Sequence, residues 1–258
     1  MTGKVWLIGA GSGAPDLLTL RAARLLARAD IVFHDALVHP DTLKMAERAL
    51  LVPVGKRCGR LSSAQRFINK RLVDAARQHP VVVRLKGGDP MLFGRAQEEI
   101  AALHEAGIDV EVVPGISAAF AASADLLQSL TERGLSRSVA LLTPRVGDGE
   151  SGHDWARPAV AADTAVLYMA GRQADLIAAG LLAAGMPASR PVVLVENASL
   201  PQRRIVATRV AGLAAAATQL GDGPVLMLVG EVYEDQARRA DVEPTAVLPV
   251  LLQQARGC

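Results

Sequence analysis

The sequence predicts an α/β fold, and three observations carry this prediction. Short β-branched runs alternate with segments of helical periodicity along most of the 258 residues. Half of the residues are hydrophobic and only 3% are aromatic. The core is therefore built mainly from Ala, Val and Leu, which is usual for folds with buried parallel strands. Several strands run directly into a glycine loop that opens a helix, the kind of junction where open α/β sheets bind ligands.

The first half of the chain contains five expected strands, at residues 5–8, 30–33, 50–54, 81–86 and 109–113. Helical periodicity follows them at 18–29, 40–48, 63–78, 93–106 and from 116 onward. Pro15 and Asp16 are favourable helix-start residues, and Gly107 is placed as a helix-ending glycine.

The second half is predicted to hold strands at 138–143, 164–169, 192–196, 203–210 and 224–229, with helices near 172–184 and 210–220. Residues 144–158 are rich in Gly and Asp and indicate a loop. The tail from Tyr233 is predicted to be peripheral. Residues 130–134 resemble a linker, which predicts an N-terminal α/β domain at 1–134 and a C-terminal α/β domain at 135–258.

Three strand–glycine–helix junctions fall in the first half. The central one, 81–90, ends in Gly87, Gly88 and Asp89, and the others follow the strands at 5–8 and 109–113. Glycine allows the backbone to approach a ligand closely. Three such junctions favour one shared ligand. The alternative for the central junction is a plain two-glycine turn in which Asp89 caps the next helix.

The first loop also fits a dinucleotide-binding fingerprint through Gly9, Gly11 and Ala14. That fingerprint requires an acidic residue about 20 residues on, at the end of the next strand. Here Asp35 ends that strand, 26 residues after Gly9. A nicotinamide-dependent oxidoreductase is therefore an alternative hypothesis that explains less of the chain, since it gives no reason for the Gly-Gly-Asp-Pro loop.

Charge and composition limit the remaining function classes. The net charge is +2, from 28 basic and 26 acidic residues, so nothing points to nucleic acid or a membrane surface as partner. The sequence has no apolar run of about 18 residues, so no transmembrane helix is expected. Cys58 and Cys258 lack ligand-like spacing and suggest a reducing, cytoplasmic location. The five histidines are scattered, and no metal site is expected.

The loop after residue 54 brings Lys56 and Arg57 together between glycines. One interpretation is a solvated turn. The other is a clamp for an anionic substrate, because lysine and arginine donate hydrogen bonds to carboxylates.

These motifs together resemble the tetrapyrrole (class III) methyltransferases, over about residues 4–232. The matching pieces are 5–13, 15–20, Asp35 with Leu37 and Val38, 54–57, Gln65 with Ile68 and Asn69, 83–90, 93–95, 113–115, Tyr168 with Met169, and 195–197. The resemblance implies two α/β domains with S-adenosyl-L-methionine in the cleft between them, and a homodimer. It implies C-methylation of a tetrapyrrole, with uroporphyrinogen III as the expected substrate and precorrin-2 as the product of two methyl transfers.

The resemblance also implies roles for individual residues. Asp35 matches a proton acceptor and Lys56 a proton donor, and Arg95 is counted with them as a catalytic candidate. Cofactor contacts are implied for Ser12, Gly87, Gly88, Asp89, Leu92, Ser117, Ala118, Met169 and Ala198. Substrate contacts are implied for Arg57, Arg95, Glu98 and Arg133.

The chain departs from the family pattern at Ala36, Glu132, Pro144 and Arg145. The loss of a cation at 36 and the gain of a carboxylate at 132 both weaken a site for a polyanion. A later corrinoid intermediate is therefore an alternative substrate, and a catalytically idle tetrapyrrole- or cofactor-binding protein is a third hypothesis.

Overall fold

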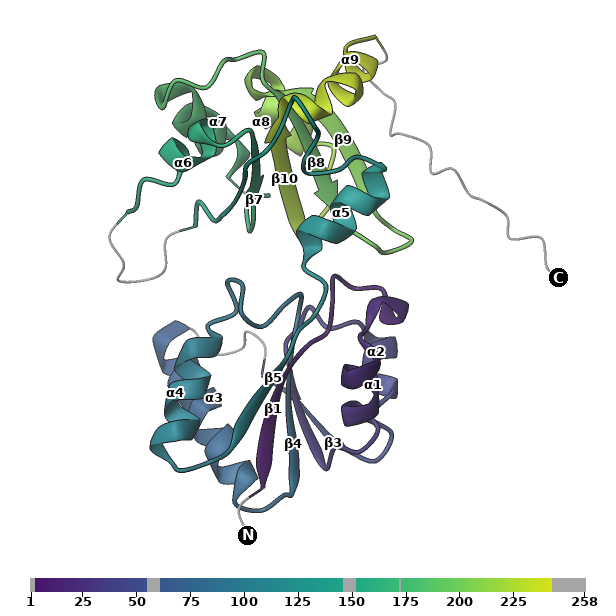
Figure 1. Cartoon of the computed structure of the whole chain (residues 1–258), viewed down its shortest axis with the longest axis vertical. Helices are drawn as coiled ribbons and strands as arrows, with labels where there is room; N and C mark the ends of the chain where they lie inside the picture. Colours follow the sequence, from purple (N-terminus) through teal and green to yellow (C-terminus); the bar gives the residue numbers. More distant parts are fainter. Residues whose placement is uncertain (1–2, 55–60, 146–151, 172, 243–258) are drawn as a thin grey trace, which may run out of the picture. The chain divides into compact units, whose positions relative to one another are not determined.

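The structure is a computed structural model that describes residues 3–54, 61–145, 152–171 and 173–242. The described residues form two compact units, one up to Ala121 and the other from Ala122. Each unit is built around its own five-stranded sheet (Figure 1). The predicted α/β class is confirmed, and the predicted domain boundary after residue 134 stays a prediction.

The first sheet is entirely parallel, with strand order β3-β2-β4-β1-β5. Its strands are β1 (Lys4–Gly9), β2 (Ile31–His34), β3 (Leu50–Pro53), β4 (Val81–Lys86) and β5 (Val110–Val113). All five were predicted to within one residue at most ends. Because β4 and β5 flank β1, the three strands that carry glycine junctions are neighbours.

Helices cover both faces of the first sheet (Figure 1). The helices of the first unit are η1 (Pro15–Leu17), α1 (Leu20–Leu26), α2 (Pro40–Lys44), α3 (Leu61–Ala76) and α4 (Ala96–Glu105), and α5 (Ala118–Leu126) runs from this unit into the second. Leu72 and Leu103 place α3 and α4 in one core with Val82, whereas Leu26 places α1 in the other core with Leu85. Alternate residues of β4 therefore serve opposite faces, as the pleat of a strand requires.

Two predicted helix starts are wrong. Pro15 begins only a single 3₁₀ turn, and Leu18 then returns to an extended conformation. The helix α1 starts at Leu20, where the Thr19 side chain accepts a hydrogen bond from the Ala22 amide at 3.2 Å. The helix expected from residue 93 starts at Ala96, because Phe93 and Arg95 both have a positive φ. Gly107 does end α4, with a φ of 67°.

The second sheet is mixed, with strand order β6-β7-β10-β8-β9. Its strands are β6 (Val139–Leu142), β7 (Thr164–Leu167), β8 (Pro191–Glu196), β9 (Arg204–Arg209) and β10 (Val225–Gly230). β10 is antiparallel to both β7 and β8, so the carboxyl ends of β7 and β8 lie at the same edge.

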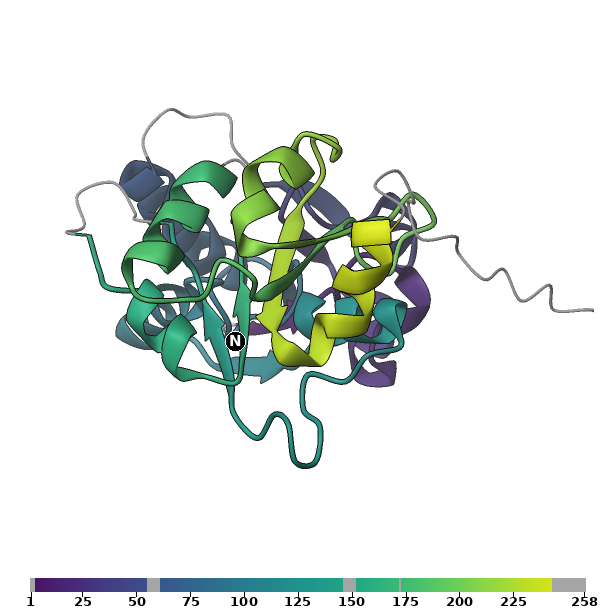
Figure 2. The same ribbon diagram turned by 90° about the horizontal axis from the view of Figure 1, so that it is seen from above.

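The helices of the second unit are α6 (Ala156–Ala161), α7 (Ala174–Ala183), η2 (Val210–Gly212), α8 (Leu213–Ala217), η3 (Glu231–Tyr233) and α9 (Glu234–Val242). Ala159, Ile177 and Leu213 bring α6, α7 and α8 into one apolar core with the sheet. α9 lies on the other side of this sheet, against β9 and β8 (Figure 2).

The prediction that the chain is peripheral from Tyr233 is wrong for the residues that the structure describes. Tyr233 and Ala237 are both fully buried. Within the described part of the chain, no helix is long and apolar enough to span a membrane.

Candidate active site

The loops that follow β4, β1 and β5 meet at the carboxyl edge of the first sheet. The Gly88 amide donates to the Gly11 carbonyl at 2.7 Å, and the Gly11 amide donates to the Gly88 carbonyl at 3.2 Å. The Ala10 amide donates to the Lys86 carbonyl at 2.7 Å. The two glycine loops therefore extend the pairing of β1 and β4 past the end of the sheet. The prediction that the three junctions share one ligand stays a prediction.

Two glycines are required where these loops pack on one another. A Cβ on Gly9 would lie 2.6 Å from both the Gly115 Cα and the Gly88 carbonyl oxygen. A Cβ on Gly115 would collide with the same carbonyl oxygen and with Gly9. Such distances are not tolerated by real Cβ atoms, so only glycine allows the three backbones to approach this closely.

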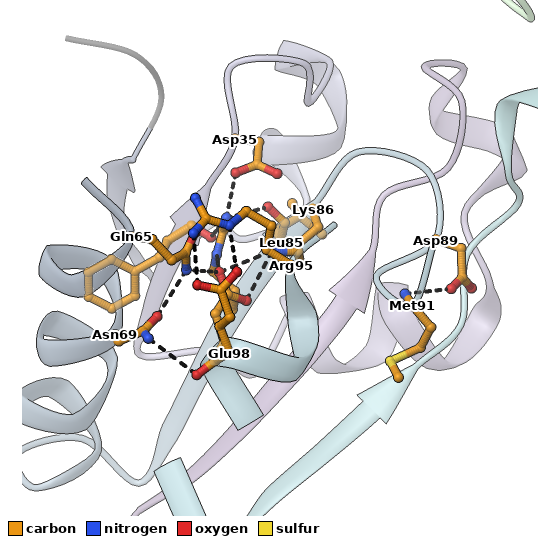
Figure 3. A network of polar contacts seen from close by, with 12 residues as sticks. Asp35, Gln65, Asn69, Leu85, Lys86, Asp89, Met91, Arg95 and Glu98 are labelled. Carbon is orange, nitrogen blue, oxygen red and sulfur yellow. Dashed lines mark hydrogen bonds and ion pairs between the residues drawn. The ribbon is translucent and has the colours of Figure 1, made fainter. Parts of the chain in front are cut away.

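The Asp89 carboxylate joins the loop after β4 to the loop after β5. Its Oδ1 accepts from the Met91 amide at 2.8 Å, and its Oδ2 accepts from the Gly115 amide at 3.0 Å. Figure 3 shows Asp89 and Met91 beside each other in the central loop. In this structure both carboxylate oxygens hold the protein backbone, which gives Asp89 a role in shaping the loops whatever else it contacts.

Gly88 leaves open space above the junction. Its φ is 68°, and a Cβ added there would meet nothing within 4 Å. The other predicted contact residues of the first unit belong to the loops after β1, β4 and β5. Ser12 is in the loop after β1, Leu92 follows Asp89, and Ser117 and Ala118 stand at the start of α5. Ser117 is buried, whereas Ser12 and Leu92 are half-buried.

The second unit carries the two remaining predicted cofactor contacts, Met169 and Ala198. They follow β7 and β8, so they lie at the same edge of that sheet. The Asn197 amide donates to the Pro224 carbonyl at 3.0 Å, which ties the Ala198 loop to the start of β10. Met169 has a φ of 57° and is 46% exposed. A strained, exposed apolar residue of this kind is typical of a binding surface.

Asp35 stands at the carboxyl end of β2 and is held by Arg84 of β4. The Asp35 amide donates to the Leu85 carbonyl at 3.2 Å. The Arg84 Nη2 donates to Asp35 Oδ1 at 2.6 Å. The Asp35 side chain is 31% exposed, whereas that of Arg84 is 3% exposed. The structure thus presents one carboxylate at the sheet edge with a buried cation behind it.

Behind Asp35 lies a buried polar network that the sequence reasoning did not identify (Figure 3). Its centre is Glu99, which accepts from Arg84 Nε at 3.0 Å and from Gln65 Nε2 at 3.2 Å. Both Glu99 oxygens accept from Lys86 Nζ at 3.0 Å. Burial lowers the pKa of Lys86, and the adjacent Arg84 cation lowers it further. Burial opposes the charge on Arg84 as well, but Glu99 and Asp35 together raise the pKa of Arg84.

One signal in the sequence could have revealed this network. Arg84 and Lys86 lie two residues apart in a strand that is otherwise apolar, so both must point to the same buried face. Buried cations require carboxylate partners. Nothing in the sequence alone, however, selects Glu99 rather than the adjacent Glu98 as that partner.

Arg95 and Glu98 form a second, exposed pair at the start of α4. The Arg95 Nε donates to Glu98 Oε1 at 2.6 Å, and Arg95 Nη2 donates to Glu98 Oε2 at 2.7 Å. This two-point contact presents the guanidinium in a fixed orientation. Arg133 is exposed in the second unit, between α5 and β6. Lys56 and Arg57 lie outside the described residues.

The fold is an α/β arrangement in which three loops gather at the carboxyl ends of parallel strands, where open α/β sheets usually bind ligands. A family model described as Tetrapyrrole (Corrin/Porphyrin) Methylases matches residues 4–214. The chain belongs to this family.

Three known proteins illustrate the similarity. The uroporphyrinogen-III C-methyltransferase of Pseudomonas aeruginosa is 44% identical over 236 residues, which are 91% of this chain and 96% of that protein. The crystal structure of uroporphyrin-III C-methyl transferase from Thermus thermophilus complexed with S-adenyl homocysteine has a TM-score of 0.79 and 38% identity, covering 90% of this chain and 100% of that one. The siroheme synthase of Hydrogenovibrio crunogenus is 40% identical over 92% of this chain. This chain spans 50% of that longer protein.

Proposed function

We propose that the chain uses S-adenosyl-L-methionine to methylate uroporphyrinogen III twice at carbon, giving precorrin-2 for sirohaem or cobalamin synthesis. The observation that carries the proposal is the convergence of the loops after β4, β1 and β5 beside Asp35. The names of the relatives from Pseudomonas aeruginosa and Thermus thermophilus support the reaction, since each aligns with this chain over nearly its whole length.

The loops of the first unit fit the proposed cofactor. S-adenosyl-L-methionine, when bound, supplies a methyl group activated by the positive sulfonium. Gly88 leaves room for a ligand to approach the backbone, and the neighbouring loops carry the hydroxyl groups of Ser12 and Ser117. Ser12, Gly87, Gly88, Asp89, Leu92, Ser117, Ala118, Met169 and Ala198 are the residues proposed to hold the cofactor.

The proposed role of the protein is to align the acceptor carbon and to move protons. Alignment of two reactants can contribute about 7–11 kcal/mol to lowering the barrier. Asp35 is proposed to accept the proton that the macrocycle loses as the new C–C bond forms, and Lys56 to donate a proton. A carboxylate whose orientation is fixed by Arg84 is suited to this task.

The substrate carries eight carboxylates, which arginine and lysine are proposed to bind. Arg95 is the described candidate closest in sequence to the Gly88 loop, and Glu98 fixes its orientation. Arg57 and Arg133 are proposed as further contacts. Ala36 and Glu132 supply no cation, and for this reason the choice of tetrapyrrole needs a direct test.

The test is a reaction with S-adenosyl-L-methionine and an acceptor under reducing, anaerobic conditions. We expect uroporphyrinogen III to be consumed with the gain of two methyl groups. If a precorrin is methylated and uroporphyrinogen III is not, the proposed substrate is wrong. If neither acceptor gains mass although S-adenosyl-L-homocysteine binds, the chain is an idle binding protein.

A thermal-shift screen tests the cofactor separately. A ligand at 100 times its dissociation constant stabilises the folded state by about 2.7 kcal/mol. We expect S-adenosyl-L-homocysteine to raise the melting temperature and NAD to leave it unchanged. Stabilisation by NAD alone would favour the oxidoreductase hypothesis.

We further propose that the enzyme is a cytoplasmic homodimer. The proposal rests on the family resemblance and on the cysteine usage. Light scattering after size exclusion should give about twice the chain mass of 27.0 kDa. A mass equal to one chain at micromolar concentration would contradict it.

A further inference from the structure

Glu99 is a fully buried carboxylate that the proposed reaction does not use directly. It lies in the first turn of α4 and is 0% exposed. Its oxygens accept hydrogen bonds from Arg84, Lys86 and Gln65. A buried carboxylate with this many donors is satisfied, and its removal would take away the carboxylate that pairs with Lys86 and leave Arg84 with Asp35 as its remaining carboxylate contact among the described residues.

Arg84 joins Glu99 to the sheet edge. Its Nε donates to Glu99, and its Nη2 donates to Asp35. Its Nη1 donates to the carbonyl oxygens of Leu85 at 3.2 Å and Phe33 at 3.5 Å. The guanidinium is planar and rigid, so contacts at one end fix the position of the other end.

The exposure of the three groups follows their order in this chain of contacts. The side chain of Glu99 is 0% exposed, that of Arg84 is 3% exposed and that of Asp35 is 31% exposed. Glu99 thus lies inside the protein, Arg84 connects it to Asp35, and of these three side chains Asp35 alone reaches the surface. Figure 3 shows Asp35 at one end of this network.

We propose that Glu99 is a positioning residue which fixes the carboxylate of Asp35 for proton transfer by holding Arg84. Asp35 and Glu99 each contact Arg84, through different nitrogens of one guanidinium, Nη2 and Nε. The role of Asp35 as a proton acceptor rests on the proposed function, whereas the coupling of Glu99 to Asp35 rests on the contacts alone.

The effect of Glu99 on the orientation of Asp35 can be separated from its effect on folding stability by a variant that keeps the buried charges balanced. Arg84 and Lys86 carry two positive charges, and Asp35 and Glu99 carry two negative charges. Glu99→Gln leaves an excess cation in the interior, and this variant alone could unfold the protein. The paired variant Glu99→Met/Lys86→Met removes one charge of each sign, which buried ion pairs often tolerate without loss of stability. It also removes the carboxylate that anchors Arg84.

The first test is a double-mutant cycle of unfolding between the Glu99 variants and Asp35→Asn. Urea titration gives the unfolding equilibrium constant of each variant, and no activity is needed. If the two sites were independent, the change in the unfolding equilibrium constant of the double variant would equal the product of the changes in the two single variants. We expect the measured value to differ from this product by at least about threefold, because both residues contact Arg84. If Glu99→Gln does not fold, the same cycle is measured with the paired variant. A double variant whose unfolding equilibrium constant agrees with that product to within twofold would overturn the proposed coupling.

The second test measures single-turnover methyl transfer with both substrates saturating. We expect the paired variant to fold, to keep the dissociation constant of S-adenosyl-L-homocysteine within about twofold, and to transfer methyl at least tenfold more slowly. When the same two substitutions are added to Asp35→Asn, they should change the rate of methyl transfer by less than twofold, because the carboxylate that Arg84 would position is already absent. An equal loss in both backgrounds, or no loss in either, would overturn the positioning role.

The two tests distinguish failure of this inference from failure of the proposed function. If the wild-type chain transfers no methyl to uroporphyrinogen III, the proposed function is wrong for that acceptor. The unfolding cycle still decides whether Glu99 and Asp35 are coupled. If the wild type is active and the cycle shows no coupling, the positioning role alone fails.

Discussion

At the residue scale, the site depends on a carboxylate whose orientation is determined by buried groups behind it. Asp35 is exposed enough to meet a substrate, yet its Oδ1 lies 2.6 Å from a nearly buried guanidinium. Glu99 accepts a hydrogen bond from Nε of the same guanidinium. The proposed proton acceptor is therefore supported by structure that lies entirely within the first unit.

The first prediction concerns Asp35. Replacement by Asn keeps the size and one acceptor oxygen but removes the basic carboxylate. We expect single-turnover methyl transfer to slow by about 10²–10⁴-fold, the usual contribution of a general base. Isothermal titration should show unchanged binding of S-adenosyl-L-homocysteine. A rate within threefold of wild type would remove Asp35 from the mechanism.

The second prediction concerns Tyr233. Its hydroxyl is buried and has no hydrogen-bond partner among the described residues, and burial raises its pKa. An unsatisfied buried polar group costs about 1–3 kcal/mol. Tyr233→Phe should therefore keep or increase the unfolding free energy measured in urea, by up to about 1 kcal/mol. A loss of more than 1 kcal/mol would show that the hydroxyl makes a stabilising contact.

At the scale of elements, function is concentrated where strands end. The loops after β4, β1 and β5 share backbone hydrogen bonds, and Gly9 and Gly115 let them pack without side chains between them. In the second unit, the loops after β7 and β8 lie at one edge in the same way. The strands thus provide rigid supports, and the loops carry the proposed ligand contacts.

The third prediction compares two glycines with nearly equal backbone conformation. Gly88 has a φ of 68° and Gly107 a φ of 67°, and a Cβ on either would meet nothing within 4 Å. Alanine at each position should cost a similar 1–2 kcal/mol in stability, because both need left-handed backbone. Only Gly88→Ala should weaken binding of S-adenosyl-L-homocysteine, by at least about tenfold.

Gly107→Ala is the matched control for this comparison, since it ends α4 at the other end of the helix from the loops. Titration calorimetry of the two variants with S-adenosyl-L-homocysteine separates the effect of backbone strain, which both share, from the effect of a lost ligand contact, which is expected for Gly88→Ala alone. Equal affinities in Gly88→Ala and Gly107→Ala would mean that the Gly88 surface does not face the cofactor.

The fourth prediction concerns the entry to β6 and β7. Hydrogen bonds from the Arg137 amide and from both the hydroxyl and the amide of Ser138 hold the pKa of Asp163 below its usual range. A carboxylate with a lowered folded-state pKa contributes stability above its unfolded pKa. That contribution is lost as the pH falls through the folded-state pKa.

Urea midpoints measured between about pH 5 and pH 2 should therefore fall with pH, and they should fall less steeply in Asp163→Asn. The same slope in wild type and variant would contradict this account of the Asp163 hydrogen bonds.

Strands and glycine junctions were the parts of the fold that the sequence could predict. The runs that became β1, β4 and β10 are β-branched and bounded by glycine or proline, so local signals agree with the tertiary structure. Helix starts were less accurate, because Phe93 and Arg95 adopt left-handed backbone that their residue types do not indicate. α9 was missed because its burial depends on β8 and β9, which lie far away in the chain.

The candidate site was predictable to a similar extent. The sequence indicated the three loops through their glycines, and the family resemblance supplied Asp35 and Arg95. The network around Glu99 was not predicted, since the pairing of residues 84 and 99 depends on how α4 packs on β4. Asp89 was assigned to the cofactor, whereas the structure also gives its oxygens two backbone partners.

At the scale of the whole molecule, the two units have different sheets. The first is all parallel and carries Asp35 with the three glycine loops, and the second is mixed and carries Met169 and Ala198. Membership of the tetrapyrrole methylase family is shown by the match over residues 4–214. The departures at Ala36 and Glu132 are at exposed positions, so neither side chain belongs to a hydrophobic core.

The most direct measurement of the central claim is the mass of the product formed from uroporphyrinogen III and S-adenosyl-L-methionine that carries a deuterated methyl group. The reaction is kept anaerobic and reducing, and Asp35→Asn serves as the control. The account predicts two deuterated methyl groups on the tetrapyrrole with the wild-type chain and a strongly reduced yield with the variant. An unmodified tetrapyrrole, from wild-type protein that binds S-adenosyl-L-homocysteine, would contradict it.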